Sequence, residues 1–204
     1  GRMPGRRAGE EERERQILDA AASLAMRTGL DRLTVRAIAA RAGLSNGLVH
    51  FHFENKDALL LALLDELLKA TLVLDISPEV AAVAQPRERL RRLLRTEMER
   101  LAGAPARLRL FFEFWLWGMR RREVRRRLRK QLDRYRAAFL PIADEVLAEV
   151  PERFAHVGRE GLAHACAGFV KAAAVQSVID PARFRVDQFI DAVTALARVD
   201  TSSP

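Results

Sequence analysis

Residues 33–53 read LTVRAIAARAGLSNGLVHFHF, which predicts two short helices joined by a tight turn. Thr34 is a suitable N-cap for a first helix over residues 35–42. Gly43 ends that helix, because glycine adopts a positive φ without steric cost. Ser45 then caps a second short helix. Two helices separated by a glycine turn predict a helix-turn-helix, whose second helix usually enters the major groove of DNA.

Spaced residues inside and around this motif form a longer pattern: Ile17, Leu18, Ala21 and Gly29; Thr34, Val35, Ile38, Ala39, Ala42 and Gly43; Gly47 to Phe53; then Lys56, Leu59 and Leu60. This pattern resembles the N-terminal domain of the TetR family of repressors and covers about residues 11–62. The chain departs from the family at His50, where Tyr is usual, and at Ala25, where Phe is usual. The resemblance implies a DNA-binding transcriptional regulator.

The predicted DNA contacts lie on the two motif helices and at the start of the next helix. Asn46 can pair with adenine, Gly47 lets the backbone approach the duplex, and Leu48 offers apolar surface to a thymine methyl group. The resemblance implies base or phosphate contacts for most of the others, with packing against a neighbouring helix as the alternative for Phe51 and His52. The full set is Thr34, Val35, Arg36, Ser45, Asn46, Gly47, Leu48, His50, Phe51, His52 and Lys56.

Apolar residues recur at helical spacing along the chain, and no segment shows the two-residue period of a strand. The sequence therefore predicts an all-α protein, with an N-terminal three-helix helix-turn-helix domain and a larger C-terminal helical bundle. The predicted divisions are a flexible basic arm (1–9), a DNA-binding domain (10–55), a connecting helix (56–74), an effector-binding and dimerisation domain (75–199) and a tail (200–204).

The net charge of +8 is distributed unevenly over the 204 residues. Residues 1–60 hold ten Lys or Arg against eight Asp or Glu, whereas residues 107–136 hold twelve against three. Net charge is therefore a weak argument for DNA binding here, and the motif carries the prediction. The arginine-rich run over 120–130 is interpreted as a solvated helix face, with electrostatic support of DNA binding as the alternative.

Other classes of protein receive little support from the sequence. Its start lacks the apolar core of a signal peptide, and no uninterrupted apolar run has the length of a membrane span. The single Cys166 fits a reducing compartment, so a cytoplasmic protein is expected, with no membrane partner. His, Cys and Ser residues follow no catalytic or metal-binding spacing. We therefore predict that the chain is not an enzyme and has no cofactor or metal site.

The most aromatic segment of the chain runs from Phe111 to Trp117 and predicts the effector pocket. Pockets for small molecules are mostly apolar, with few polar groups. Glu113 is the polar group here, and it can pair either with an arginine of the preceding helix or with a cationic effector. The alternative for the whole segment is an ordinary buried core. The predicted pocket residues are Met98, Phe111, Glu113, Phe114, Trp115 and Trp117.

The last two predicted helices have the composition of a close helix–helix interface. One is rich in Gly and Ala, and small side chains let helices approach closely; the other adds larger apolar side chains. Together they can form a four-helix bundle across a two-fold axis, which resembles how TetR-type proteins dimerise. The alternative is a core within one chain. The predicted interface comprises Gly161, Ala165, Gly168, Phe169, Ala172, Phe189 and Val193.

Taken together, these patterns predict a homodimeric transcriptional regulator, a repressor that a small-molecule effector releases from a palindromic double-stranded operator. One alternative is a DNA-binding activator or architectural protein that acts without an effector. The other is a helical enzyme or small-molecule carrier in which the motif is fortuitous. The sequence does not specify the operator or the effector.

Overall fold

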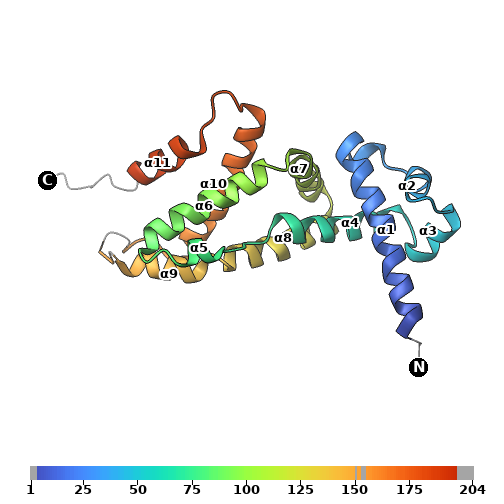
Figure 1. Ribbon diagram of the computed structural model, residues 1–204, viewed down its shortest axis with the longest axis horizontal. Helices are drawn as coiled ribbons and strands as arrows, with labels where there is room; N and C mark the ends of the chain where they lie inside the picture. The colour runs from blue at the N-terminus through green and yellow to red at the C-terminus, as the bar shows by residue number, and fades with distance from the viewer. Residues whose placement is uncertain (1–3, 150, 153–154, 197–204) are drawn as a thin grey trace. The chain divides into compact units, whose positions relative to one another are not determined.

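The computed structural model describes residues 4–149, 151–152 and 155–196, and all regular structure within them is helical (Figure 1). The all-α prediction is confirmed. The helices are α1 (Pro4–Thr28), the 3-10 helix η1 (Leu30–Arg32), α2 (Val35–Ala42), α3 (Asn46–His52), α4 (Lys56–Thr71), α5 (Pro78–Ala81), α6 (Pro86–Ala102), α7 (Pro105–Arg120), α8 (Arg122–Ala137), α9 (Leu140–Glu149), α10 (Arg159–Ile179) and α11 (Val186–Leu196).

The chain forms two compact units, and each is made of two separate segments. Unit 1 comprises residues 1–71 and 106–131, and unit 2 comprises residues 72–105 and 132–204. The predicted functional domains followed the chain in order, whereas these units interleave, so that α7 and most of α8 belong with the N-terminal helices. The assignment of functions to segments of the chain stays a prediction.

Most of the N-terminal arm that was expected to be flexible is helical in the structure. Helix α1 begins at Pro4, so only residues 1–3 of the predicted arm lie outside the described residues. Proline is favoured in the first turn of a helix, and the arginine, alanine and glutamate residues that follow are good helix formers. These residues favour a helix enough to outweigh Gly5 and Gly9, which are poor helix formers, and this explains the earlier start.

Unit 1 is organised around α1, which packs against α2, α3 and α4. Ile17, Ala21 and Ala25 are fully buried at a spacing of four residues, so they form one continuous stripe on α1. Helix α4 adds Leu59, Leu60, Leu63, Leu64, Leu67 and Leu68, all buried. Each buried leucine contributes about 1.5–3 kcal/mol of transfer free energy, so α4 is a main part of this core.

Helix α7 contributes its own buried residues to unit 1. Leu110, Phe111 and Phe114 are fully buried, and the next helix adds Val124 and Leu128. The two helices pass closely at Gly118, where a Cβ atom would lie only 2.6 Å from the Cδ1 atom of Leu128. A side chain at this position would require Leu128 to shift, so glycine allows α8 to pack closely against α7.

Unit 2 is built on the packing of α10 against α6 and α9, with α11 against α6 and α10. Helix α10 turns a face of small residues toward its neighbours: Ala163, Cys166, Ala167, Val170, Ala173 and Ala174 are buried. By length and composition alone, α10 is the one described helix that could cross a membrane. The central helix of a folded helical core has the same composition, and the buried face of α10 contacts protein within unit 2.

Candidate DNA interface

The two motif helices end and begin as the sequence predicts. The Thr34 hydroxyl accepts a hydrogen bond from the backbone N–H of Ala37 at 3.1 Å and caps α2. Gly43 adopts φ 69°, and its N–H bonds to carbonyls of the last turn. The Ser45 hydroxyl accepts from the N–H of Leu48 at 3.1 Å and caps α3. The two caps define where α2 and α3 begin, and Gly43 defines where α2 ends.

Helix α3 divides cleanly into a buried face and an exposed face. Val49 is 1% exposed and Phe53, just after the helix, is 9% exposed, so both anchor α3 to unit 1. Phe51 is 70% exposed, a large fraction for an aromatic side chain. Asn46 and His50 are exposed as well. A large exposed aromatic ring among exposed polar side chains is compatible with a surface that binds a partner.

The predicted phosphate contacts lie at helix ends or on exposed turns. Arg36 is exposed in the first turn of α2, and Lys56 is half-buried in the first turn of α4. Asn55 caps α4 by accepting from the N–H of Ala58 at 2.8 Å. Within the described residues, neither Arg36 nor Lys56 has a side-chain hydrogen bond or ion pair. Both cations are therefore available to phosphate groups.

Helix α1 braces both motif helices through side chains. The Gln16 amide donates to the carbonyl of Ala42 at 2.7 Å and holds the end of α2. The Glu14 carboxylate lies 3.7 Å from the Nδ1 atom of His52 at the end of α3. The His52 side chain is only 5% exposed. Its position therefore agrees with the alternative given for His52, packing against a neighbouring helix.

The predicted effector residues do not form one cluster within either unit. Five of them lie on α7 in unit 1, where Phe111 and Phe114 are core residues in ring contact with Trp115 and Trp117, respectively. Met98 lies on α6 in unit 2. The alternative given for this segment, an ordinary buried core, describes Phe111 and Phe114 in unit 1.

Glu113 has protein partners, but not the predicted one. Its Oε2 atom accepts a hydrogen bond from the backbone N–H of Leu30 at 2.7 Å, and its Oε1 atom lies 3.6 Å from Nε of Arg109. Arg109 is on the same helix, one turn away, and not on the preceding helix. Glu113 therefore ties α7 to the turn at Gly29 and Leu30, which follows α1.

Met98 lines an apolar cavity of about 170 Å³ in unit 2, among α6, α9, α10 and α11. The neighbours of Met98 around the cavity include Cys166, Phe169 and Phe189. Two arginines complete the rim, Arg87 and Arg91, and both are in ion pairs at 2.6 Å, with Glu149 and Asp191. Burial raises the pKa of the Cys166 thiol to about 12, so this sulfur is a neutral wall of the cavity.

Comparison with known protein families explains the arrangement of the motif. Residues 17–63 match the family described as bacterial regulatory proteins of the tetR family. Residues 86–199 match the family described as the C-terminal part of BetI-type transcriptional repressors. The second match alone covers more than half of the chain. The chain belongs to the TetR family.

Curated relatives agree with this assignment. The HTH-type transcriptional regulator BetI of Paraburkholderia phymatum is 29% identical over 153 residues, which cover 75% of this chain and 76% of the relative. BetI of Cronobacter sakazakii is 27% identical over 87% of this chain and 89% of its own length. The protein is thus a TetR/BetI-type transcriptional regulator and not an enzyme.

Solved structures share the TetR fold of this chain. A putative transcriptional regulator from Pseudomonas aeruginosa PAO1 superimposes with a TM-score of 0.73 at 22% identity, covering 92% of this chain and 91% of that one. A putative transcriptional regulator from Saccharomonospora viridis, solved in complex with choline, gives a TM-score of 0.70 at 20% identity, with 93% and 97% covered.

The predicted dimer residues of this TetR-family chain fall into two groups. Gly161, Gly168 and Ala172 are exposed along one side of α10, and a Cβ atom at either glycine would meet no other atom within 4 Å. Phe169 and Phe189 instead make ring contact with each other at 5.9 Å. Phe169, Phe189 and Val193 line the apolar cavity of unit 2, and Ala165 is half-buried. The first group presents an open surface, whereas the two rings pack within the chain.

Sequence reasoning missed the most buried charge of this regulator. Glu97 on α6 is completely buried, and its Oε2 atom accepts from the Tyr135 hydroxyl at 3.0 Å and from Arg100 at 2.8 Å. Burial and the Glu97 charge raise the pKa of Tyr135, so its hydroxyl stays protonated and donates. The signal in the sequence was its spacing, because Glu97 lies four residues from both Leu93 and Leu101 and so falls on the apolar stripe of α6.

Lys171 extends this polar cluster along α10. Its Nζ atom donates to the carbonyl of Ala167 at 2.5 Å and lies 5.8 Å from the centre of the Tyr135 ring. Burial, aided by the nearby Arg136 charge, lowers the pKa of Lys171 to about 8. Lysines are rarely held in such surroundings, and sequence spacing does not indicate this one.

Proposed function

We propose that this TetR-family regulator is a repressor that binds a palindromic operator as a homodimer and leaves it when a small effector binds. The observation that carries the DNA-binding part is the exposed face of α3, where Phe51 stands in water beside Asn46 and His50. Direct readout needs side chains of this kind on a helix that fits the major groove. Such a protein acts where the chromosome is, so we place it in the cytoplasm.

The proposal of a dimer is supported by the open side of α10. One helix-turn-helix reads a short half-site, so a palindrome requires two copies. Gly168 lies in the middle of the exposed side of α10, and the space beyond its Cα atom is empty in a single chain. A second α10 can therefore approach this side closely.

The proposal of an effector is supported by the apolar cavity in unit 2. Its walls are aliphatic and aromatic, and its two arginines are already paired with carboxylates. No carboxylate is among the described residues that line it, so an apolar molecule fits this cavity better than a small cation does. Choline, which the Saccharomonospora viridis regulator binds, is the second candidate.

The first experiment tests DNA binding. Sequences that the protein retains from a random pool of DNA are expected to contain an inverted repeat. Phe51→Ala is expected to weaken binding of the selected duplex by about 10-fold or more, the effect of losing one good base contact. Met119→Ala is the matched control, because Met119 is 64% exposed and lies outside the motif. Equal affinities of the two variants would contradict the assignment of α3 as the reading helix.

The second experiment tests the dimer surface. Gly168→Leu adds a side chain where a single chain has room, so folding should be preserved while approach of a second α10 is blocked. Sedimentation is expected to show a monomer that binds the palindrome far more weakly. Ala148→Leu, at an exposed position of α9, is the control and should remain a dimer. A dimer in both variants would place the interface elsewhere.

The third experiment tests the effector site. Metabolites of apolar character and choline are added to the protein–DNA complex, and release of labelled duplex is followed by fluorescence anisotropy. A releasing compound is expected to lose its effect in Leu162→Trp, which fills the unit 2 cavity. Release that is unchanged in this variant would show that the effector binds outside the cavity.

A further inference from the structure

The positive charge of unit 1 lies mainly outside the helices that carry the DNA-binding motif. Residues 1–71 hold eleven Lys or Arg against ten Asp or Glu, whereas residues 106–131 hold ten against two. Eight of the nine excess positive charges of unit 1 therefore come from α7 and the first part of α8. This distribution is unusual for a DNA-binding unit, because neutralisation of phosphates by Lys and Arg supplies much of the affinity for DNA.

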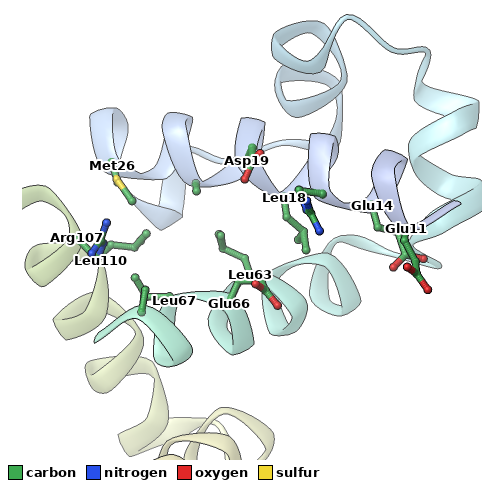
Figure 2. A pocket seen from close by; sticks show the side chains of 13 residues that line it. Glu11, Glu14, Leu18, Asp19, Met26, Leu63, Glu66, Leu67, Arg107 and Leu110 are labelled. Carbon is green, nitrogen blue, oxygen red and sulfur yellow. The ribbon is translucent and has the colours of Figure 1, made fainter. Parts of the chain in front are cut away.

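Acidic residues on the first and fourth helices explain the near balance in residues 1–71. Figure 2 shows Glu11, Glu14 and Asp19 on α1 and Glu66 on α4, and all four line the groove between these helices. The motif is thus surrounded by charges of both signs. Phosphate groups near it meet little net positive charge from α1 to α4.

The turn between α7 and α8 brings arginines to the beginning of α4. The guanidinium group of Arg121 lies 3.7 Å from the Asp57 carboxylate in the first turn of α4. Two turns further along both helices, Arg127 is paired with Asp65. The first part of α8 therefore runs beside α4 in the same direction, and it begins where α4 begins, at the predicted phosphate contact Lys56.

Arg120 and Arg122 stand on either side of Arg121 and are exposed. Within the described residues, neither has a side-chain hydrogen bond or ion pair. The next carboxylate along the chain, Glu123, is already paired with Arg126. The guanidinium groups of Arg120 and Arg122 are therefore available to a partner outside the chain.

We propose that Arg120 and Arg122 bind the phosphate backbone of DNA beside the half-site that α3 reads. The place of the contact beside that half-site rests on the proposal that α3 is the reading helix. DNA is the partner that fits, because the turn is continuous with the predicted phosphate contact at Lys56. The positive charge of the turn also complements a polyanion where the motif helices supply little charge of their own.

Arg121 acts as a positioning residue in this arrangement. Its guanidinium group lies 4.3 Å from the centre of the Trp117 ring on α7 and 3.7 Å from the Asp57 carboxylate, so it ties the turn to both helices. The Asp57 side chain is 80% exposed and follows Lys56 directly. By pairing with Asp57, Arg121 offsets a negative charge that would otherwise repel the phosphate at Lys56.

The main test compares two double variants that lose the same charge. Arg120→Gln with Arg122→Gln removes the proposed contacts. Arg129→Gln with Lys130→Gln is the matched control, because both residues are exposed and lie about 10 Å further along α8, away from the beginning of α4. Binding of the duplex selected from a random pool is measured by fluorescence anisotropy at several salt concentrations.

The turn variant is expected to bind the duplex about 10-fold more weakly and to lower the slope of log affinity against log salt by about 1 to 2. About 0.9 counterion is released for each phosphate neutralised, so this change corresponds to the loss of one or two contacts. The control is expected to lower the slope by less than half as much. Equal effects in the two variants, or no effect in the turn variant, would overturn the proposal.

A duplex of scrambled sequence separates this proposal from the assignment of α3. Loss of a phosphate contact weakens binding of both duplexes by a similar factor, whereas Phe51→Ala weakens binding of the selected duplex alone. If Phe51→Ala has its effect and the turn variant changes neither affinity, the proposal for the turn fails alone. If Phe51→Ala has no effect, the assignment of α3 fails, but equal losses for both duplexes in the turn variant still support the phosphate contact.

The positioning role of Arg121 predicts opposite signs for the two members of its ion pair. Arg121→Gln is expected to weaken DNA binding about 3-fold, because the Asp57 charge is no longer offset beside Lys56, and Asp57→Asn is expected to strengthen binding by a similar factor. A merely structural pair would weaken binding in both variants, and that result would contradict the role. Circular dichroism of each variant checks that the helices are retained.

Discussion

Glu97 in unit 2 and Glu113 in unit 1 both lie within apolar stretches of helix, but their partners and exposure differ. Glu97 is completely buried and is held by a phenol hydroxyl and a guanidinium group. The Glu113 side chain is 28% exposed and accepts from a backbone N–H, with an arginine nearby. One carboxylate is a buried ion with side-chain partners, and the other completes the hydrogen bonding of a turn.

This difference predicts which of the two carboxylates contributes more to the stability of the fold. Removing a buried charged side chain, or one of its partners, lowers the free energy of unfolding by several kcal/mol, because water cannot reach the group that remains and replace the lost bond. A half-exposed carboxylate can be replaced in part by water, so its removal costs about the value of one hydrogen bond. The following variants test this ranking, and all are compared by urea denaturation.

Glu97→Ala is expected to have the largest effect, a loss of about 3 kcal/mol of unfolding free energy, because Tyr135 and Arg100 lose their buried acceptor. Glu97→Gln is the control: its amide oxygen can still accept from Tyr135, so we expect it to recover part of the loss. A loss below about 1 kcal/mol for Glu97→Ala would show that the burial of Glu97 does not make its two hydrogen bonds more important than those of an exposed carboxylate.

Lys171→Met should increase stability at pH 7 by about 2 kcal/mol, after discounting for partial exposure, because it removes a cation held in apolar surroundings. The folded-state pKa, about 8, lies below the unfolded value, so protonation disfavours the folded state. The advantage of the variant is therefore full below pH 8 and shrinks as pH rises toward 10.5. Denaturation between pH 7 and 9.5 checks this, since Tyr135 titrates above that range. A difference that does not change with pH would contradict the role of the charge.

Glu113→Ala is expected to cost about 1–2 kcal/mol, because the backbone N–H of Leu30, a buried residue, loses its acceptor. Glu113→Gln keeps an oxygen in the same place and should cost less than half as much. If Glu113→Ala destabilises the protein more than Glu97→Ala does, the ranking by burial is wrong.

Arg109→Ala is expected to have the smallest effect, below about 0.5 kcal/mol. The Arg109 side chain is 53% exposed, and its contacts, the ion pair with Glu113 and a hydrogen bond to the carbonyl of Met26, are exposed ones of a kind that contributes little. A cost equal to that of Glu113→Ala would contradict this ranking by exposure.

The sequence predicted local structure well where local chemistry decides it. The caps at Thr34 and Ser45 and the positive φ of Gly43 are all confirmed, because each depends on residues within one turn. The buried and exposed faces of α3 also follow from spacing alone. The DNA contacts themselves stay predictions.

Long-range partners could not be predicted in the same way. Glu113 was identified as unusual, but the N–H that it binds lies 83 positions away in the chain. Glu97 and Tyr135 are 38 positions apart, and no local pattern joins them. The aromatic segment suggested a pocket, whereas packing buries Phe111 and Phe114 as core residues. Composition gives the apolar character of a helix but not the element that covers it.

The interleaved construction of unit 1 has a consequence for biosynthesis. A ribosome releases α1 to α4 first, but Glu113, Phe111 and Phe114 follow only after the first segment of unit 2 has been made. Until then the leucines of α4 lack the part of their cover that α7 and α8 supply, and Leu30 lacks its acceptor. Nascent chains of about this length are expected to need a chaperone, since exposed apolar surface on incomplete domains promotes aggregation. Ribosome-bound chains that end after residue 71 should be cut by protease more readily than chains that extend beyond residue 131.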